Sequence, residues 1–272
     1  MDDWEWVLWT DDDNLELVRR YFPWLEDTFA SLPGDIYRAD LARNLYMYLF
    51  GGVYIDLDTE CLRPTSAALD ALHVSHAATD ASNTTVRGGA EHQRQVAMFG
   101  RMGNDANFQH SIPNAWMAAP PGHPFFLMPL VAAKAAIAEG RSLLHKLWHY
   151  WPSAEQMTGP IALRKAIRQY QTRGLGLEVR RLAAVGPFAA ARPQDLRNDL
   201  VLLDDFWVYP FNWRKADLRA ICSVEKEGFD AERCKAMLET SEKGSISITY
   251  WSHTHRGKGV DEHNIGTLNQ ED

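Results

Sequence analysis

The alternation of apolar and polar side chains near the start of the chain predicts a strand followed by a helix. Residues 4–10, WEWVLWT, alternate and are rich in aromatic side chains, which is typical of a strand, here one that ends at the acidic stretch DDDN. Residues 14–22, NLELVRRYF, have helical spacing, and Asp12 or Asp13 is a candidate N-cap. The chain is therefore expected to begin with a strand, an acidic turn and a helix.

A second helix and a second strand meet at a pair of glycines. The helical pattern runs over residues 36–50 and stops at Gly51 and Gly52, because glycine readily adopts the left-handed backbone that ends many helices. The run VYIDL that follows is apolar and β-branched, as expected of a buried strand. Residues 73–79, HVSHAAT, are a candidate for a further strand.

The rest of the chain alternates between polar stretches, helical patterns and short apolar runs. Residues 80–112 are polar and rich in Gly, Asn and His, which favours a long functional loop. A helix is predicted after Pro129, and an amphipathic helix is predicted over residues 159–174, with Pro160 in its first turn. Short strands are predicted at residues 177–181, 201–203 and 246–251.

Because helices alternate with strands through most of the chain, the predicted fold class is α/β, with a sheet covered by helices on both faces. No Pro-, Gly- or Ser-rich linker divides the sequence, so residues 1–272 are expected to form a single domain. In folds of this class ligands bind beyond the carboxyl ends of the strands. The residues that follow VYI are therefore the first candidates for a functional site.

Composition narrows the function classes. The net charge of −8 and the lack of a dense Lys/Arg cluster argue against nucleic acid as a partner, since phosphate contacts depend on basic side chains. Three cysteines are too few for a disulfide scaffold, although Cys222 and Cys234 are able to pair in an oxidising compartment. The start MDDWEWVLW lacks the features of a signal peptide, and FFLMPLVAA is too short to span a bilayer. We expect a soluble chain.

The triplet Asp56-Leu57-Asp58 is the strongest candidate for chemistry. If strand geometry persists, the period of two places both carboxylates on one side. Two carboxylates this close repel unless a cation or a hydrogen-bond network lies between them. A hard divalent cation such as Mg²⁺ or Mn²⁺ satisfies them and leaves positions for phosphate oxygens. The alternative is a solvated acidic pair at a strand end, since such triplets also occur by chance.

The helix before the glycines carries a polar stripe. Asp40, Arg43 and Asn44 are three and four positions apart and share one helical face, opposite an apolar face. An intrahelical salt bridge on a solvated face is the simple interpretation, and it contributes little to stability. Because this helix runs directly into the aspartate strand, the stripe is also expected to lie close to the candidate metal site.

Together these motifs resemble a known family. Residues 38–58, RADLARNLYMYLFGGVYIDLD, look like the signature of glycosyltransferase family 32, the DXD sugar-binding family, which includes fungal Golgi initiation-specific α-1,6-mannosyltransferases and inositol phosphoceramide mannosyltransferases. Five further blocks are similar to the family and occur in the same order: WEWVLWTDDDN, NAWMAAPPGHPFF, MTGPIAL, FWVYPFNW and YWSHTHRGKG. Of these, FWVYPFNW corresponds to a late strand of the family. These blocks extend over nearly the whole chain.

The resemblance implies a role for each matching residue. Asp58 would bind the metal directly, and Asp56 would contact the metal or the ribose. Asp40 and Arg43 would hold the hydroxyls and the phosphate of the donor sugar, with Tyr54 beside the donor phosphates.

Five more residues have expected roles. Asn114 would help to position the donor. His253 matches the histidine that approaches the metal and the diphosphate, and His255 is its rival two residues later. Thr158 and Gly159 would face the cleft at the start of a helix.

The sequence also departs from the family. The family's opening strand, of the type IPKIIHQ-x-W, which forms part of the nucleotide-base wall, has no counterpart before WEWVLWT. The Ser-Trp pair that often follows the family's histidine is replaced by HTHRGKG. The missing strand indicates either that the sequence is truncated before it or that base binding is built differently, and the second departure indicates different contacts to the phosphates.

The resemblance implies a GT-A fold, in which a Rossmann-like sheet binds a nucleotide sugar, and a retaining transferase that depends on Mn²⁺ or Mg²⁺. The expected reaction moves mannose from GDP-mannose to a glycan or glycolipid acceptor with an α-linkage, in the Golgi lumen. UDP-galactose, UDP-glucose and UDP-N-acetylglucosamine are alternative donors. A non-catalytic carbohydrate-binding scaffold and a metal-dependent hydrolase are alternative functions.

Overall fold

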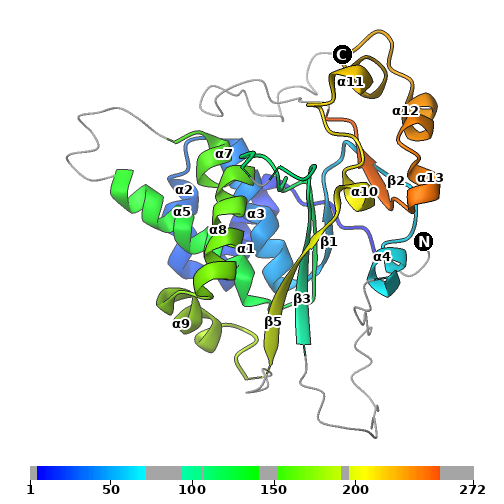
Figure 1. The fold of residues 1–272 in the computed structure, drawn as a ribbon. Helices are drawn as coiled ribbons and strands as arrows, with labels where there is room; N and C mark the ends of the chain where they lie inside the picture. The colour runs from blue at the N-terminus through cyan, green and yellow to red at the C-terminus, as the bar shows by residue number, and fades with distance from the viewer. Residues whose placement is uncertain (1–4, 72–93, 106, 141–151, 191–195, 252–272) are drawn as a thin grey trace, which may run out of the picture.

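The computed structural model describes residues 5–71, 94–105, 107–140, 152–190 and 196–251. Figure 1 shows a central sheet with a layer of helices on one side and a smaller group of short helices and strands on the other. The α/β class and the helices on both faces are therefore confirmed as a mixed α/β architecture.

The central sheet has four described strands and mixed pairing. They lie in the order β1-β4-β3-β5, and their bounds are Gly52–Ile55 (β1), Trp116–Ala119 (β4), Arg94–Gly100 (β3) and Arg197–Leu203 (β5). β4 is antiparallel to both β1 and β3, whereas β3 and β5 are parallel. β1, which leads into the aspartates, thus lies at one end of this order and is fixed by β4.

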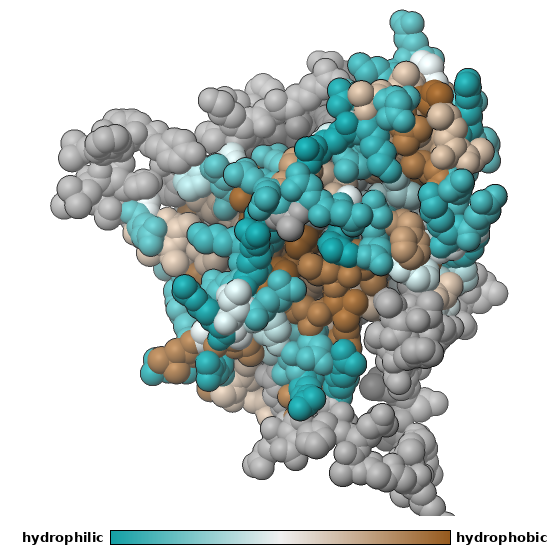
Figure 2. Space-filling view, in the orientation of Figure 1, coloured by the Kyte–Doolittle hydropathy of each residue, from teal (hydrophilic) through white to brown (hydrophobic). Residues whose placement is uncertain are grey.

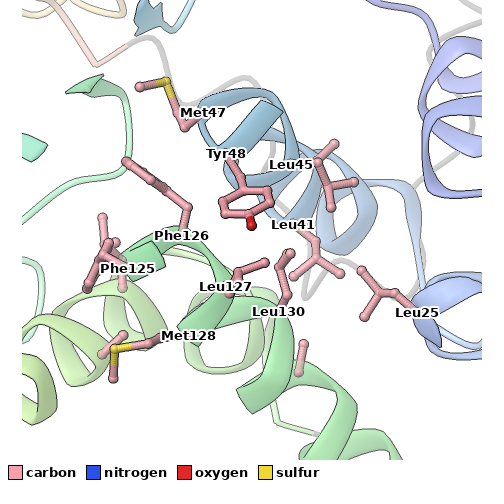
Figure 3. Packing of buried hydrophobic residues seen from close by; sticks show 14 of the residues in the cluster. Leu25, Leu41, Leu45, Met47, Tyr48, Phe125, Phe126, Leu127, Met128 and Leu130 are labelled. Carbon is pink, nitrogen blue, oxygen red and sulfur yellow. The ribbon is translucent and has the colours of Figure 1, made fainter. Parts of the chain in front are cut away.

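The first face of the sheet packs on the larger helical layer. Its elements are α1 (Asp11–Tyr21), a 3₁₀ turn η1 (Pro23–Leu25), α2 (Glu26–Ala30), α3 (Asp35–Leu49), a 3₁₀ turn η2 (Pro124–Phe126), α5 (Leu127–Gly140), α7 (Ala154–Met157), α8 (Pro160–Arg173) and α9 (Leu177–Val185). Figure 3 shows Tyr48 of α3 near Phe126 and Leu127, with Leu41 and Leu130 close by. This apolar contact holds α3 in place, because fully buried side chains of this size each stabilise the fold by about 1.5–3 kcal/mol.

The second face packs on the smaller group. It contains the antiparallel pair β2 (Thr59–Cys61) and β6 (Ser247–Thr249) and the short helices α4 (Ser66–Ala71), α10 (Asp205–Val208), α11 (Ala216–Cys222), α12 (Ala231–Met237) and α13 (Thr240–Lys243). A disulfide between Cys222 and Cys234 joins α11 to α12. Within β3, Ala97 and Phe99 belong to the first core and Val96 and Met98 to the second. This alternation is the period of two expected of a strand buried on both faces.

β5 lies at the other end of the strand order, so one of its edges faces away from β3. Figure 2, which has the orientation of Figure 1, shows hydrophobic side chains gathered in the middle of the visible surface, where β5 lies in Figure 1. Leu200, Val201 and Leu202 are half-buried, in agreement with that view.

The expected first strand is wrong. The described residues 5–10 form no strand, and Trp6, Val7 and Leu8 are exposed. Trp9 instead stacks on Tyr46 at 4.9 Å between ring centroids. A strand needs a ladder partner from elsewhere in the chain, and an alternating pattern alone does not provide one.

The cap of the first helix also differs from the prediction. Thr10, and not Asp12 or Asp13, is the N-cap of α1, and it forms a capping box with Asp13. The Asp13 backbone N–H donates to Thr10 Oγ1 at 3.3 Å, and the Thr10 backbone N–H donates to Asp13 Oδ2 at 2.8 Å. Threonine with an acidic residue three positions later is a known form of this motif, and the acidic run concealed it.

Three predictions for the chain after residue 80 are wrong. The expected loop over residues 80–112 contains β3. The apolar run VAMF before Gly100 is buried on both faces of the sheet, and such a strand shows no alternation of apolar and polar residues in the sequence. The strand expected at residues 177–181 is part of α9, since Val179 and Ala183 place their side chains on one buried helical face. The expected strand in FWVYPFNW is the short helix α10 followed by irregular chain.

The other predicted elements agree with the structure where it describes them. α3, α8, β1, β5 and β6 occupy the expected places, and α5 begins at Leu127, two residues before Pro129. Residues 73–79 lie outside the described residues. No helix in the described part of the chain is both long and apolar enough to cross a bilayer.

Candidate functional site

The glycine pair sets the direction of the chain between α3 and β1. Gly51 and Gly52 have φ values of +63° and +82°, which favour glycine. A Cβ on Gly51 would lie 2.5 Å from Pro121 N, so this position also requires a residue without a side chain. The turn thus places the end of α3 and the start of β1 side by side, as the sequence predicts.

The aspartates lie in a turn and not on a continued strand. β1 ends at Ile55, and the Thr59 backbone N–H donates to the Asp56 carbonyl oxygen at 3.1 Å, which closes a turn over residues 56–59. Leu57, at its tip, is 92% exposed, and the side chains of Asp56 and Asp58 are half-buried. The strand alternation assumed for the two carboxylates therefore does not hold, because the chain turns here to pair β2 with β6.

The polar stripe of α3 is buried. Asp40 is 5% exposed and Arg43 is 6% exposed, so the simple interpretation of a solvated face is wrong. Arg43 Nη2 lies 2.9 Å from Asp40 Oδ1, and Arg43 Nη1 donates to Asp56 Oδ1 at 3.2 Å and to the Asn114 carbonyl oxygen at 2.7 Å. The Asn114 side chain donates to Asp40 Oδ1 at 2.8 Å. Asp40, Arg43, Asp56 and Asn114 therefore form one connected group.

Tyr54 and Asn44 extend this group. The Tyr54 hydroxyl donates to Asp56 Oδ1 at 2.7 Å, and the Arg43 guanidinium lies 4.8 Å from the centroid of the Tyr54 ring. Asn44 donates to the Asp40 backbone carbonyl at 3.1 Å. One carboxylate oxygen of Asp56 thus accepts from both the Arg43 guanidinium and the Tyr54 hydroxyl, and the side chain is partly open to solvent.

The charges in this group determine its protonation. Burial opposes the charged form of Arg43, but Asp56, Tyr54 and Asp40 outweigh it and raise the pKa of the guanidinium above its ordinary value. Burial raises the pKa of the Tyr54 hydroxyl, which Arg43 opposes and Asp56 reinforces. At neutral pH the group therefore contains a permanent cation and a protonated phenol.

The start of α8 faces Asp40. Thr158 and Gly159 are buried there, at the helix start that the sequence predicts. A Cβ on Gly159 would lie 2.8 Å from Asp40 Oδ2. The N-terminus of a helix favours negative charge, so the Asp40 carboxylate lies where α8 stabilises it.

Tyr209, in the YP block, is a site residue that the sequence did not single out. It is 1% exposed, and no described residue forms a hydrogen bond of good geometry with its hydroxyl. Burial raises the pKa of this hydroxyl well above its ordinary value, and Asp56 raises it further, while the backbone of Trp116 lowers it. The sequence gives little indication of this role, because residue order alone does not show that Tyr209, 153 positions after Asp56, lies near that carboxylate.

β6 brings the end of the described chain to the aspartate turn. Thr249 pairs with Thr59, and their hydroxyls lie 2.9 Å apart. Because the strands are antiparallel, the chain after Thr249 runs toward Asp58. His253 and His255, the expected metal-binding histidines, lie outside the described residues.

The turn offers a metal ion two candidate carboxylate ligands, Asp56 and Asp58. No cluster of three or more His, Cys, Asp or Glu side chains able to hold a metal occurs in the described ranges. His123 is fully buried and caps η2 through Nδ1, which accepts from the Phe125 N–H at 3.4 Å, so its role is structural.

Comparison with known proteins agrees with the motifs. Residues 1–76 match the family model described as a glycosyltransferase sugar-binding region containing a DXD motif. Inositol phosphoceramide mannosyltransferase 3 of Schizosaccharomyces pombe is 43% identical over 61 residues, which cover 22% of this chain and 17% of that protein. A mannosyl phosphorylinositol ceramide synthase of Saccharomyces cerevisiae is 30% identical over 172 residues, or 62% of this chain and 35% of that protein.

Another match of similar length has lower identity. Inositol phosphoceramide mannosyltransferase 1 of Schizosaccharomyces pombe is 26% identical over 167 residues, or 61% of this chain and 41% of that protein. The matched segments thus span less than half the length of these relatives. No solved structure matches the chain significantly. The predicted resemblance to the DXD sugar-binding glycosyltransferase family is confirmed, with the family region itself at residues 1–76 and relatives that are named mannosyltransferases.

Proposed function

We propose that this protein is a metal-dependent, retaining glycosyltransferase that moves mannose from GDP-mannose to a glycolipid acceptor with an α-linkage. One observation carries the proposal: the buried Asp40–Arg43–Asn114 group binds Asp56, the first residue of the DXD turn, through a hydrogen bond from Arg43. A solvated acidic pair would not need a buried cation and a phenol directed at it. The names of the relatives support mannose and an inositol phosphoceramide acceptor.

The donor set fits a hard divalent cation. Asp56 and Asp58 supply two carboxylates at a partly open turn, and Mg²⁺ or Mn²⁺ sites commonly use one or two carboxylates together with phosphate oxygens. His253, with His255 as the rival, is the proposed third protein ligand. When bound, the cation would neutralise the negative charge that grows on the leaving diphosphate.

The surrounding residues would bind and orient the donor. Arg43 is a permanent cation whose Nε has no hydrogen-bond partner in the described structure, so it keeps an N–H for a ligand oxygen. Asp40 and Asn114 are proposed to bind the hydroxyls of the donor sugar, with Tyr54 beside the phosphates. Such preorganised groups lower the barrier because they need no reorientation during the reaction.

The bond changes are those of glycosyl transfer with retention. The anomeric C–O bond to the diphosphate breaks through an oxocarbenium-like transition state, and the acceptor hydroxyl oxygen forms the new bond on the same face. The hydroxyl proton passes to the departing phosphate oxygen. No protein nucleophile is assigned to this step.

The proposed fold type is GT-A, with the mixed sheet as its nucleotide-sugar-binding part. The proposed location is the Golgi lumen. The Cys222–Cys234 disulfide supports a luminal location, because disulfides persist in oxidising compartments and are rare in the cytosol. The same fold with a UDP-sugar, and a carbohydrate-binding scaffold without turnover, are the competing functions.

A donor screen tests the proposal. Purified protein is incubated with GDP-mannose, UDP-glucose, UDP-galactose or UDP-N-acetylglucosamine, with Mn²⁺ or with EDTA, and release of the nucleoside diphosphate is measured. We expect release from GDP-mannose that requires Mn²⁺. Release from a UDP-sugar alone would replace mannose as the donor. Failure of every donor, together with no thermal stabilisation by GDP or UDP with Mn²⁺, would contradict the transferase.

A further inference from the structure

A chain of aromatic rings leads away from the aspartate turn. The Tyr209 ring lies 5.3 Å from Trp251, between ring centroids, and Trp251 lies 4.5 Å from Trp213 in an edge-to-face arrangement. Trp251 is anchored because its Nε1–H donates to the Phe211 carbonyl oxygen at 3.0 Å. Trp213 is therefore held in a fixed position, two rings from the hydroxyl of Tyr209.

A segment that precedes Asn114 in the sequence also contacts Trp213. Asn114, which donates to Asp40, follows a segment that contains Phe108 and His110. The centroid of Trp213 lies 6.2 Å from Phe108 and 6.3 Å from His110. Phe108, His110 and Trp213 thus form one cluster, which we call the aromatic platform, and Trp251 connects it to Tyr209.

The platform is not simply part of the core. Phe108, His110 and Trp213 are half-buried, whereas Trp251 and Tyr209 behind them are buried. The rings therefore keep part of their surface open although they pack on one another. Half-buried aromatic rings that are held rigidly from behind are suited to bind a ring at low entropic cost.

Polar groups surround the platform. His110 Nε2 lies 3.9 Å from Glu155 Oε2, and Arg164 Nε donates to Ser111 Oγ at 3.1 Å. Arg214 lies over the Phe108 ring at 4.5 Å and pairs with Asp105 at 3.1 Å. Hydroxyl groups of a ligand would thus meet both donors and acceptors beside an apolar face, as in typical small-molecule sites.

The charges at the rim of the platform balance. Glu155 and Asp105 supply two carboxylates, and Arg164 and Arg214 supply two guanidinium groups. A rim without excess positive charge does not specifically attract a diphosphate, and it suits an uncharged ring with many hydroxyls. The C–H faces of a sugar or an inositol match aromatic rings, and their hydroxyls match the polar rim.

We propose that the aromatic platform of Phe108, His110 and Trp213 binds the hydroxylated six-membered ring of the acceptor, an inositol or a sugar. This inference rests on the proposed function, and it deepens that function by naming where the acceptor ring lies. The donor diphosphate would occupy the aspartate turn, and the platform would hold the acceptor hydroxyl beside it.

Substitution of Trp213 tests the platform. Trp213→Ala and Trp213→Phe are compared with the wild type in transfer to detergent-dispersed inositol phosphoceramide and in donor hydrolysis without acceptor. We expect Trp213→Ala to raise the acceptor KM about tenfold, the size of a lost stacking contact. Trp213→Phe should raise it less, and the KM for donor hydrolysis should stay within about twofold, since the donor does not touch the platform.

Trp207 offers a matched control. It is a half-buried tryptophan of α10 whose ring packs on Phe206, outside the platform. Trp207→Phe should leave the acceptor KM unchanged. An unchanged acceptor KM in folded Trp213→Ala would overturn the inference, and so would a raised KM for donor hydrolysis, which would place the nucleotide there instead.

A binding measurement separates this inference from the proposed function. Saturation-transfer NMR follows myo-inositol and methyl α-mannoside in the presence of wild type or Trp213→Phe, without any donor. Saturation of either probe by the wild type that weakens in the variant supports the platform even if no nucleotide sugar is turned over. Equal saturation by both proteins, or none by the wild type, sinks the platform but leaves the transferase proposal to the donor screen.

Discussion

Two neighbouring parts of the site, the polar stripe of α3 and the DXD turn, contain the same kinds of side chain in opposite surroundings. Asp40 and Arg43 are buried and paired with each other, whereas Asp58 is half-buried in a turn whose tip, Leu57, is exposed. Asp56 belongs to both, since one oxygen accepts from Arg43 and Tyr54 while the side chain stays partly open. Under the proposed function both parts contact the donor, and the first part also stabilises the fold.

The comparison has an energetic basis. A buried ion pair adds little net stability, because desolvation offsets its attraction, but removal of one partner leaves an uncompensated charge. A carboxylate in an open turn is solvated in either state. Substitutions in the two parts should therefore separate stability from activity.

The largest expected effect is on turnover at the DXD turn. Asp58→Asn should lower transfer by about a hundredfold or more, the usual loss of a group that stabilises transition-state charge, and should change the unfolding free energy by only about 0.5 kcal/mol. Asp56→Asn is the matched variant, and it should lose both activity and stability because it releases Arg43. Initial rates and urea unfolding measure the two effects. Normal turnover by Asp58→Asn would remove it from the metal site.

The next effect is on stability at α3. Arg43→Ala should lower the unfolding free energy by about 3–5 kcal/mol, because Asp40 and Asp56 lose their common cation. Arg38 on the same helix pairs with Asp35 near the surface, so Arg38→Ala should cost about 1 kcal/mol or less. Urea unfolding of both variants provides the comparison. Equal costs would mean that burial of the Arg43 group has been overestimated.

The glycine turn that joins the two parts should show a third, smaller effect. Ala at either glycine adopts a left-handed backbone at a cost of about 1–2 kcal/mol. A Cβ at Gly51 also meets Pro121 N at 2.5 Å, whereas nothing lies within 4 Å of one at Gly52. Gly51→Ala should therefore have a clearly lower melting temperature than Gly52→Ala. The reverse order would contradict the path of the chain from α3 into β1.

The smallest effect concerns the strand that carries the turn. Partial burial opposes ionisation of Glu60 in β2, but hydrogen bonds from Lys235 and Tyr250 outweigh it and lower the pKa of this carboxyl. A lowered folded-state pKa gives stability that is present above the unfolded-state pKa of about 4.3 and is lost as pH falls through the folded-state value.

Glu60→Gln should therefore be less stable than the wild type at pH 7, and the difference should vanish at low pH. Because the side chain is 37% exposed, solvent screening limits the effect to less than about 1 kcal/mol. Thermal unfolding from pH 7 to pH 3 measures it. A difference that grows as the pH falls would have the wrong sign for this network.

Much of the site was predictable because its parts are adjacent in the sequence. The helical pattern of residues 36–50, the two glycines and the aspartates lie within one stretch, and local propensities largely determine such stretches. By contrast, Tyr209 and Trp213 lie far along the chain from Asp56. Their position depends on β5 pairing with β3 and on β6 pairing with β2, which no local pattern encodes.

The sequence by itself determined the α3–glycine–β1 unit, the family resemblance and the identity of the acidic pair. Only the tertiary structure decided that Asp40 and Arg43 are buried, that Asp56 and Asp58 lie in a turn, and that residues 5–10 form no strand. The physical reason is that spacing along one element specifies which residues share a face. Burial and strand pairing depend on the distant segment that packs against that face.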